Sequence, residues 1–201
     1  MRKSEIMTSI SPLENVLKKG LYGDHEGKSE DKLIKVKEIK NLLIAQIVQY
    51  KNSSSQVKDA SIDGLSLPHE TLKVNSNNDS RILWCGPKNW LLVSRKKNLL
   101  QIIQKSFSEN DFALTDLSHS RAIIELEGEN SKEILKKGCP FNFNELKKDN
   151  CVNSVFNGIT ITIDMTNDNP VNLRLFALRS FGESLYHSIT DSCLEDGYKG
   201  I

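Results

Sequence analysis

The chain has 201 residues, with 27 Lys and Arg against 26 Asp and Glu, so its formal net charge is +1. This length suits one domain, which would bury roughly 70% of the surface that its unfolded chain exposes. The balanced charge argues against a nucleic-acid binder, which usually carries a clear basic excess or a basic stripe.

Hydropathy and cysteine content point to the cytoplasm. No apolar run reaches the roughly 18 residues of a membrane-spanning helix, and no apolar core of a secretory signal follows the first basic residues. The cysteines lie far apart and form no Cys-x-x-Cys pair: Cys85, Cys139, Cys151 and Cys193. We therefore expect buried thiols in a reducing compartment, without a zinc site or a disulfide framework.

The N-terminal region is predicted to be a helical arm on a linker. A capping hydroxyl, a proline at the first helical position and a glutamate at the third predict a helix from Ser11 to Gly20. Residues 20–32 contain three glycines and six Asp, Glu or Lys residues, which is typical of a mobile linker. We divide the chain into this arm and linker, residues 1–32, and one α+β domain, residues 33–201. The sequence leaves open whether the arm wraps a neighbouring subunit or folds back on its own domain.

The next segments alternate between surface and core. Residues 28–40 mix lysines with acidic residues, which indicates a solvated face. Residues 42–50 are apolar on both alternations, which predicts a strand that is covered on both faces and lies centrally in a sheet. Residues 51–80 are polar, and we interpret them as loops around weak structure.

Residues 81–94 predict a β-hairpin whose turn is formed by residues 86–89. The hairpin carries Trp84 and Trp90, which we interpret as core or interface aromatics. The alternative is a platform on which a base or a pterin stacks. A helix follows at residues 97–108, where apolar residues recur three and four positions apart.

The stretch from 115 to 138 has the clearest pattern. Residues 117–127 alternate between apolar and polar side chains, which predicts a strand, and Gly128 ends it. Asn130 and Glu133 have the spacing of a capping box, so a short helix should begin there. A lysine pair followed by glycine should end this helix.

The last part of the chain predicts a three-stranded meander and a helix. Residues 151–156 and 159–166 are joined by Asn-Gly, the strongest short hairpin signal, and residues 171–178 form the third strand. Ser180 opens a second capping box, with glutamate three residues on. In the middle strand the apolar residues form one face, which we assign to the core, and Thr160, Thr162, Asp164 and Thr166 should face water or a partner.

The mixed order of strands and helices predicts an α+β fold. We expect a mainly antiparallel sheet with helices packed on one face, in addition to the N-terminal helical arm. No glycine-rich phosphate loop lies at a strand-to-helix turn.

One group of residues resembles a catalytic triad. His119 lies between Ser118 and Ser120, three residues after Asp116. On a strand, neighbouring side chains point to opposite faces, so these serines diverge from the histidine and no local triad forms. We interpret His119 as a strand histidine bonded to a backbone carbonyl. We assign no catalytic, cofactor-binding or metal-binding residue.

Several of these motifs carry a family resemblance. Asp116-Leu117-Ser118-His119, the strand after it, Gly128 and the helix ending in residues 135–140 resemble the gamma subunit of heterotetrameric sarcosine oxidase. More distantly they resemble the folate-binding fold of glycine-cleavage aminomethyltransferases. Three further places agree, in the same order along the chain: Ser11-Pro12-Leu13, Gly86-Pro87 with Trp90-Leu91-Leu92, and Arg179-Ser180-Phe181. The loops at residues 141–143 and 148–150 depart from the usual family pattern.

The resemblance implies a non-catalytic structural subunit. The family's assembly of alpha, beta, gamma and delta chains oxidises sarcosine to glycine, produces hydrogen peroxide and delivers the methyl carbon to tetrahydrofolate. The resemblance places FAD, FMN and NAD on the alpha and beta chains, zinc on delta, and no cofactor on this chain. A stand-alone folate-binding protein of one-carbon transfer is the alternative. An RNA-binding module is disfavoured by the balanced charge and by the lack of an aromatic and basic strand motif.

Overall fold

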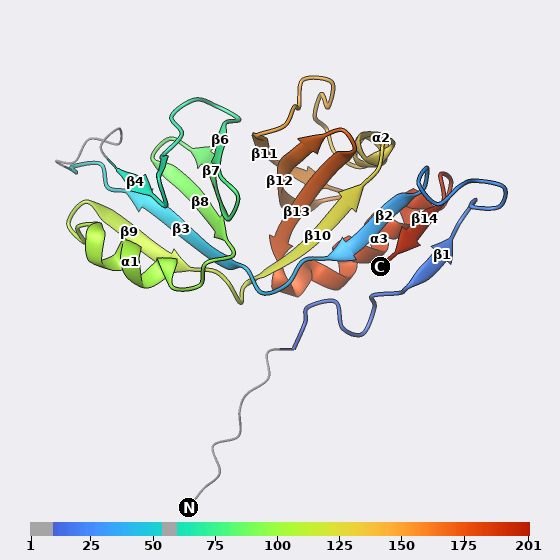
Figure 1. The fold of residues 1–201 in the computed structure, drawn as a ribbon, viewed down its shortest axis with the longest axis horizontal. Coiled ribbons are helices and arrows are strands. Elements are labelled where there is room, and N and C mark those ends of the chain that lie inside the picture. The colour runs from blue at the N-terminus through green and yellow to red at the C-terminus, as the bar shows by residue number, and fades with distance from the viewer. Residues whose placement is uncertain (1–9, 54–59) are drawn as a thin grey trace, which may run out of the picture.

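A computed structural model describes residues 10–53 and 60–201. It shows the predicted α+β fold, with two mostly antiparallel sheets that share a layer of side chains and carry helices on their outer faces (Figure 1). The chain crosses between the sheets at the bottom of this view, where β2 leads into β3 and β9 leads into β10.

The five-stranded sheet contains the predicted hairpin and the predicted central strand. All its neighbouring strands are antiparallel, in the order β6 (Val74–Ser76), β7 (Ser80–Gly86), β8 (Asn89–Ser94), β3 (Leu43–Gln49) and β9 (Phe112–Asp116). Helix α1 (Leu99–Ser106) covers its outer face, and β4 (Ser61–Ile62) and β5 (Leu65–Ser66) form a separate small hairpin.

The seven-stranded sheet contains the predicted meander. Its order is β1 (Gly20–Tyr22), β14 (Tyr198–Gly200), β2 (Ile34–Glu38), β10 (Arg121–Glu127), β13 (Val171–Leu178), β12 (Ile159–Asp168) and β11 (Asn150–Phe156). Among the described strands of this sheet, only β14 and β2 are parallel neighbours. Its outer face is covered by α2 (Ser131–Lys136) and α3 (Gly182–Cys193), and a 3-10 turn, η2 (Arg179–Phe181), leads into α3.

Alternation along each strand divides the apolar side chains among three layers. In β3, for example, Ala45 and Ile47 pack toward α1, whereas Ile44 packs toward the other sheet. A second layer lies between the seven-stranded sheet and α2 and α3, and the third lies between the two sheets. The prediction of one sheet with helices on one face therefore needs correction, because two sheets share a buried inner layer.

The predicted arm helix is wrong. Residues 12–16 form a turn in which the Leu17 amide donates to the Leu13 carbonyl at 2.8 Å, and no helix continues from it. A two-turn helix gains few hydrogen bonds, so the burial of its apolar residues decides its conformation. Leu13 is fully buried in the layer under α3, and the Lys18 amide donates to the Tyr186 hydroxyl at 3.0 Å. The described part of the arm thus lies on its own domain.

The predicted linker also contains a strand, because Gly20–Tyr22 pairs with β14 at the sheet edge. This part of the chain runs very close to the C-terminal strand. A Cβ atom added at Gly200 would lie only 1.9 Å from the Lys18 carbonyl oxygen, so this contact requires glycine. The domain boundary at residue 32 stays a prediction.

Both predicted capping boxes are wrong, although both helices exist. Asn130 has a nearly helical backbone instead of the extended one that suits an N-cap, and its side chain donates to Asp196 at 3.2 Å. Ser180 lies within η2, so α3 begins two residues later at Gly182.

Several strands were missed, including β2, β9 and β14, whereas two hairpins were correctly predicted. The lysine-rich segment contains β2, in which Ile34 and Val36 are buried, and the C-terminal residues form β14. The β7–β8 and β11–β12 hairpins form as expected. Asn157 and Gly158 have φ of 47° and 84°, which are the positive values that a type I′ turn needs.

Candidate functional site

The predicted triad lies in a turn that crosses from one sheet to the other. The strand expected from residue 117 begins only at Arg121, and the Ser120 amide closes the turn by donating to the Leu117 carbonyl at 3.0 Å. The expectation that Ser118 and His119 diverge across a strand is therefore wrong in its geometry, because residues 117–120 are not extended.

Ser118 joins this turn to β3. Its hydroxyl donates to the Asp116 carboxylate at 2.6 Å, and it accepts from the Ile44 amide at 3.0 Å. The hydroxyl and amide of Ser118 hold the pKa of Asp116 below its usual value. His119 is exposed, and its ring makes no hydrogen bond to any described residue, so the predicted carbonyl partner is wrong. Asp116 and Ser118 thus link the turn to β3, and His119 makes no hydrogen bond to either of them.

The turn forms one wall of a groove, which we call the seam groove, with a volume of about 690 Å³. Its other walls are the arm, the crossover from β2 to β3, and the start of η2. Its charged side chains and His119 are Glu14, Lys19, Glu38, Lys40, Lys97, Asp116, His119, Arg121 and Arg179. Sequence reasoning singled out Asp116 and His119 but had no means of bringing them beside the arm.

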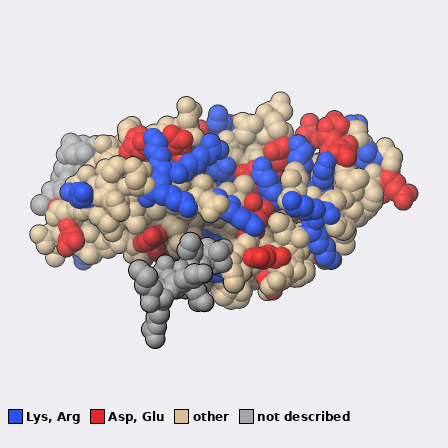
Figure 2. Space-filling view, turned by 60° about the horizontal axis from the view of Figure 1, so that its bottom comes forward, with Lys and Arg blue, Asp and Glu red and all other residues tan. Residues whose placement is uncertain are grey.

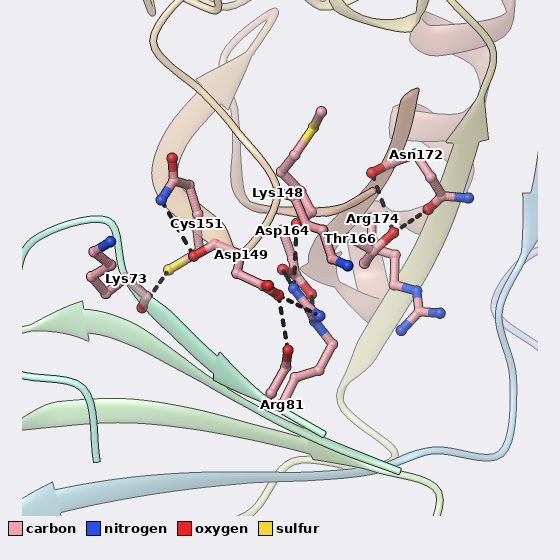
Figure 3. Close-up of polar contacts among 12 residues, drawn as sticks. Lys73, Arg81, Lys148, Asp149, Cys151, Asp164, Thr166, Asn172 and Arg174 are labelled. Atoms are coloured by element: carbon pink, nitrogen blue, oxygen red, sulfur yellow. Dashed lines mark hydrogen bonds and ion pairs between the residues drawn. The ribbon is translucent and has the colours of Figure 1, made fainter. Parts of the chain in front are cut away.

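Above this groove, a buried ion-pair cluster joins the two sheets (Figure 3). Arg81 on β7 donates from Nε and Nη2 to the two carboxylate oxygens of Asp164 on β12, each at 2.8 Å. Its Nη1 donates to Asp149 at 3.0 Å, and the Ser76 hydroxyl donates to the same carboxylate oxygen at 2.9 Å. Burial lowers the pKa of Arg81, but the hydrogen bonds and charge of Asp164 outweigh it, and the net shift is upward.

A second cluster surrounds Glu125 on β10, whose side chain is only 4% exposed. Arg174 donates to it at 2.8 Å, Lys37 lies at 2.8 Å, and Asn172 donates at 3.1 Å. Burial raises the pKa of Glu125, but the hydrogen bonds from Lys37, Arg174 and Asn172 together lower it by more. The net shift of its pKa is downward. Figure 3 shows Arg174 and Asn172 on neighbouring positions of one strand face.

These clusters correct the prediction for β12. Its polar face was expected to meet water or a partner, yet Asp164 is fully buried against the second sheet. The strand alternation correctly separated Asp164 from the apolar face. The missing information was the position of Arg81, which lies 83 residues earlier in the sequence.

The cysteine and tryptophan side chains are buried or partly buried in the protein. All four thiols are free, and burial raises the pKa of Cys85 to about 11 and that of Cys193 to about 12. Trp90 is buried, and its Nε1 donates to the Pro68 carbonyl at 2.6 Å. Trp84 packs against two of the apolar layers. Trp90 is therefore a core aromatic, and Trp84 is partly buried against the core, in line with their interpretation as core or interface aromatics.

Residues 10–53 and 60–201 contain neither a group of metal ligands nor a membrane-spanning helix. Within these ranges, no three His, Cys, Asp or Glu side chains are grouped so that they could hold a metal ion. No helix in the same part of the chain has the length and apolar character needed to cross a bilayer.

The arrangement of the two sheets is that of a known class of fold. The fold is similar to that of the glycine cleavage system aminomethyltransferase T from Bartonella henselae, with a TM-score of 0.61 and 11% sequence identity. The match covers 82% of this chain but only 47% of the aminomethyltransferase. The chain thus has an aminomethyltransferase-like fold and spans about half the length of that enzyme.

A family of proteins matches most of the chain. The model of the sarcosine oxidase, gamma subunit family matches residues 53–195, and the chain belongs to this family. It is 25% identical over 140 residues to the sarcosine oxidase subunit gamma of Corynebacterium sp. (strain U-96), covering 68% of this chain and 67% of that subunit. A chain of the heterotetrameric sarcosine oxidase from Corynebacterium sp. U-96, in complex with pyrrole 2-carboxylate, has a similar fold. Its TM-score is 0.79 at 19% identity, over 92% of this chain and 96% of that one.

Proposed function

We propose that the chain is the non-catalytic gamma subunit of a heterotetrameric sarcosine oxidase. The complex would demethylate sarcosine oxidatively to glycine, release hydrogen peroxide and pass the methyl carbon to tetrahydrofolate. The family match over residues 53–195 carries this proposal.

The polar side chains of the chain support a structural role. Asp116 and Ser118 bind each other and the backbone of β3, and Arg81 and Asp164 join the sheets. A nucleophile or general base needs a reacting atom within reach, but these groups are used within the fold.

The alpha, beta and delta subunits are the proposed partners, and they would carry the FAD, FMN, NAD and tetrahydrofolate sites in the cytoplasm. A stable assembly of this kind should bury more than about 1,000 Å² where this chain meets its neighbours.

Co-expression tests this proposal. The tagged chain should recover the other three subunits together with flavin absorbance, and the recovered complex should oxidise sarcosine. Purified alone, the chain should show no turnover of sarcosine with or without added flavin. A chain that stays alone when all four subunits are expressed would refute the proposal.

The alternative is a stand-alone folate-binding protein, which the aminomethyltransferase-like fold favours. Titration calorimetry of the isolated chain with tetrahydrofolate separates the two functions. We expect no heat of binding at micromolar concentrations. A micromolar dissociation constant would favour the alternative.

A further inference from the structure

The seam groove contains more cationic than anionic side chains. Its walls carry Lys or Arg at positions 19, 40, 97, 121 and 179, against three carboxylates. Figure 2 looks at the side of the molecule that is at the bottom of Figure 1, where the chain crosses between the sheets. Lys and Arg side chains lie across this side in several groups, with acidic side chains between them.

The carboxylates of the groove already have partners. Glu38 accepts hydrogen bonds from the Ser11 hydroxyl and pairs with Lys40 at 3.0 Å. The other two, at positions 14 and 116, accept from Ser11 and Ser118. The acidic groups are therefore satisfied inside the groove, and a cationic excess remains for a ligand.

Arg121 is the cation that most needs a partner. It is half-buried, and its only hydrogen bonds to described residues are two long ones of 3.4 Å, both to Ser120. Burial lowers its pKa, and no carboxylate offsets this. The other two arginines that lie in strands, Arg81 and Arg174, each have a carboxylate at 2.8 Å. A guanidinium fork binds a carboxylate through two parallel hydrogen bonds. Arg121 has no such carboxylate among the described residues.

An apolar surface adjoins the groove. Leu178 pairs with Arg121 across β13 and β10 and is 47% exposed, as is Phe181 in η2, and Ile10 is 64% exposed. A shallow pocket beside Leu178 shares Pro12 with the groove, so the two are continuous. Arginine is enriched in interface hot spots, and contiguous exposed apolar side chains beside it mark a surface that a partner can bury.

The charge of the groove decides between its candidate occupants. Residues 1–9 of this chain contain Arg2 and Lys3 against a single glutamate, which does not complement a cationic groove. A two-fold contact with a second copy would place the cationic surface against itself. A partner subunit with an acidic segment meets neither objection.

We propose that the seam groove binds a segment of a partner subunit that carries an Asp or Glu side chain next to an apolar one. Its carboxylate binds Arg121, and its apolar side chain packs on Leu178 and Phe181. This inference rests on the proposed function, because it names how the gamma chain would contact the assembly.

Charge reversal tests the contact in the complete assembly. In Arg121→Glu, co-expressed with the other three subunits, recovery of the partners at limiting concentration should fall by about tenfold or more. Arg121→Lys should retain part of the binding, because it keeps the charge but not the fork. The matched control is Lys105→Glu, an exposed position of α1 outside the groove, which should recover the partners like the wild type.

A crosslink gives a second measurement that does not depend on stability. A photoreactive amino acid at position 181 should attach to a partner peptide that contains Asp or Glu. A peptide without either residue, or one from a second copy of this chain, would overturn the inference. If Arg121→Glu unfolds the isolated chain, Arg121→Gln replaces it in the recovery assay.

The outcomes separate this inference from the proposed function. If the wild-type chain recovers no partner, the proposed function fails. If the wild type and Arg121→Glu, both folded, recover the partners equally, only the inference fails. If deleting residues 1–9 destabilises the wild type but not Arg121→Glu, the chain itself occupies the groove, and the inference is overturned.

Discussion

Arg81 and Arg121 lie on strands of opposite sheets, and both side chains point to the side where the sheets meet, yet their environments differ. Arg81 donates to two carboxylates from the other side of the interface between the sheets, to Asp164 at 2.8 Å and to Asp149 at 3.0 Å. Arg121 has only the long contacts to Ser120. The same residue type therefore has a stabilising role at one position and an unsatisfied binding capacity at the other.

The difference follows from the depth of each position. The side chain of Arg81 is 12% exposed, and Asp164 is fully buried, so each charge depends on the other. Arg121 stands at the first position of β10, at the wall of the open groove. Arg121 lies at the open groove, whereas Arg81 is largely covered and is already paired with carboxylates.

The largest expected effect is at the buried ion pair between Arg81 and Asp164. Asp164→Asn should lower the free energy of unfolding of the isolated chain by about 3–5 kcal/mol, because a buried guanidinium loses its charged partner. Denaturant titration measures this loss. The matched control is Asp149→Asn: its side chain is 36% exposed, so solvent screens its pair with Arg81, and its loss should stay below about 1 kcal/mol.

A double variant tests whether charge or packing holds the sheets together. Arg81→Met with Asp164→Leu should recover much of the stability that Asp164→Asn loses, because apolar pairs of similar volume often replace buried ion pairs without loss. If the double variant is no more stable than Asp164→Asn, the loss comes from packing and not from an unpaired charge.

A smaller and pH-dependent effect is expected at Glu125. Folding lowers its pKa, so its contribution is present above the pKa of the unfolded chain and is lost as the pH falls through the folded pKa. Glu125→Gln should cost about 1–3 kcal/mol at pH 7. The difference between wild type and variant should shrink as the pH falls from about 5 to below 4.

Unfolding curves of both proteins across this pH range measure the difference. The comparison matters because Asp63 and Asp116 also have lowered pKa values and destabilise the wild type in acid independently of Glu125. A difference that stays constant down to pH 3 would show that Glu125 is not bound as a carboxylate in the way described.

The sequence predicted the elements whose signals are local. Asn157-Gly158 located one hairpin, and alternation correctly predicted that Ala122, Ile124 and Leu126 are buried. It failed where a local signal competed with packing. The cap at Ser11 suggested a helix, but Leu13 is held by burial and only a turn forms; at Asn130 the helix does begin, but the side chain is bonded to Asp196 and not to the helix backbone.

The division into two sheets could not be predicted because nothing marks the crossings. Residues 39–42 and 117–120 contain no glycine or proline, so residues 117–120 were predicted as part of a strand and no turn was expected before the strand at residues 42–50. The candidate site depends on these crossings. The sequence placed Arg121 on the opposite side of β10 from the core, but it could not show that Arg81 and Arg174 find carboxylates and Arg121 does not.

The smallest expected effect is at Arg121 in the isolated chain. Since its guanidinium pairs with no carboxylate of the described residues, Arg121→Met should change the free energy of unfolding by less than about 0.5 kcal/mol. The same substitution at Arg81 removes the partner of a buried carboxylate and should cost about 3–5 kcal/mol. Parallel denaturant titrations of the two variants measure the contrast. A comparable loss at both positions would mean that Arg121 stabilises the fold, and its availability for a partner's carboxylate would then lose its physical basis.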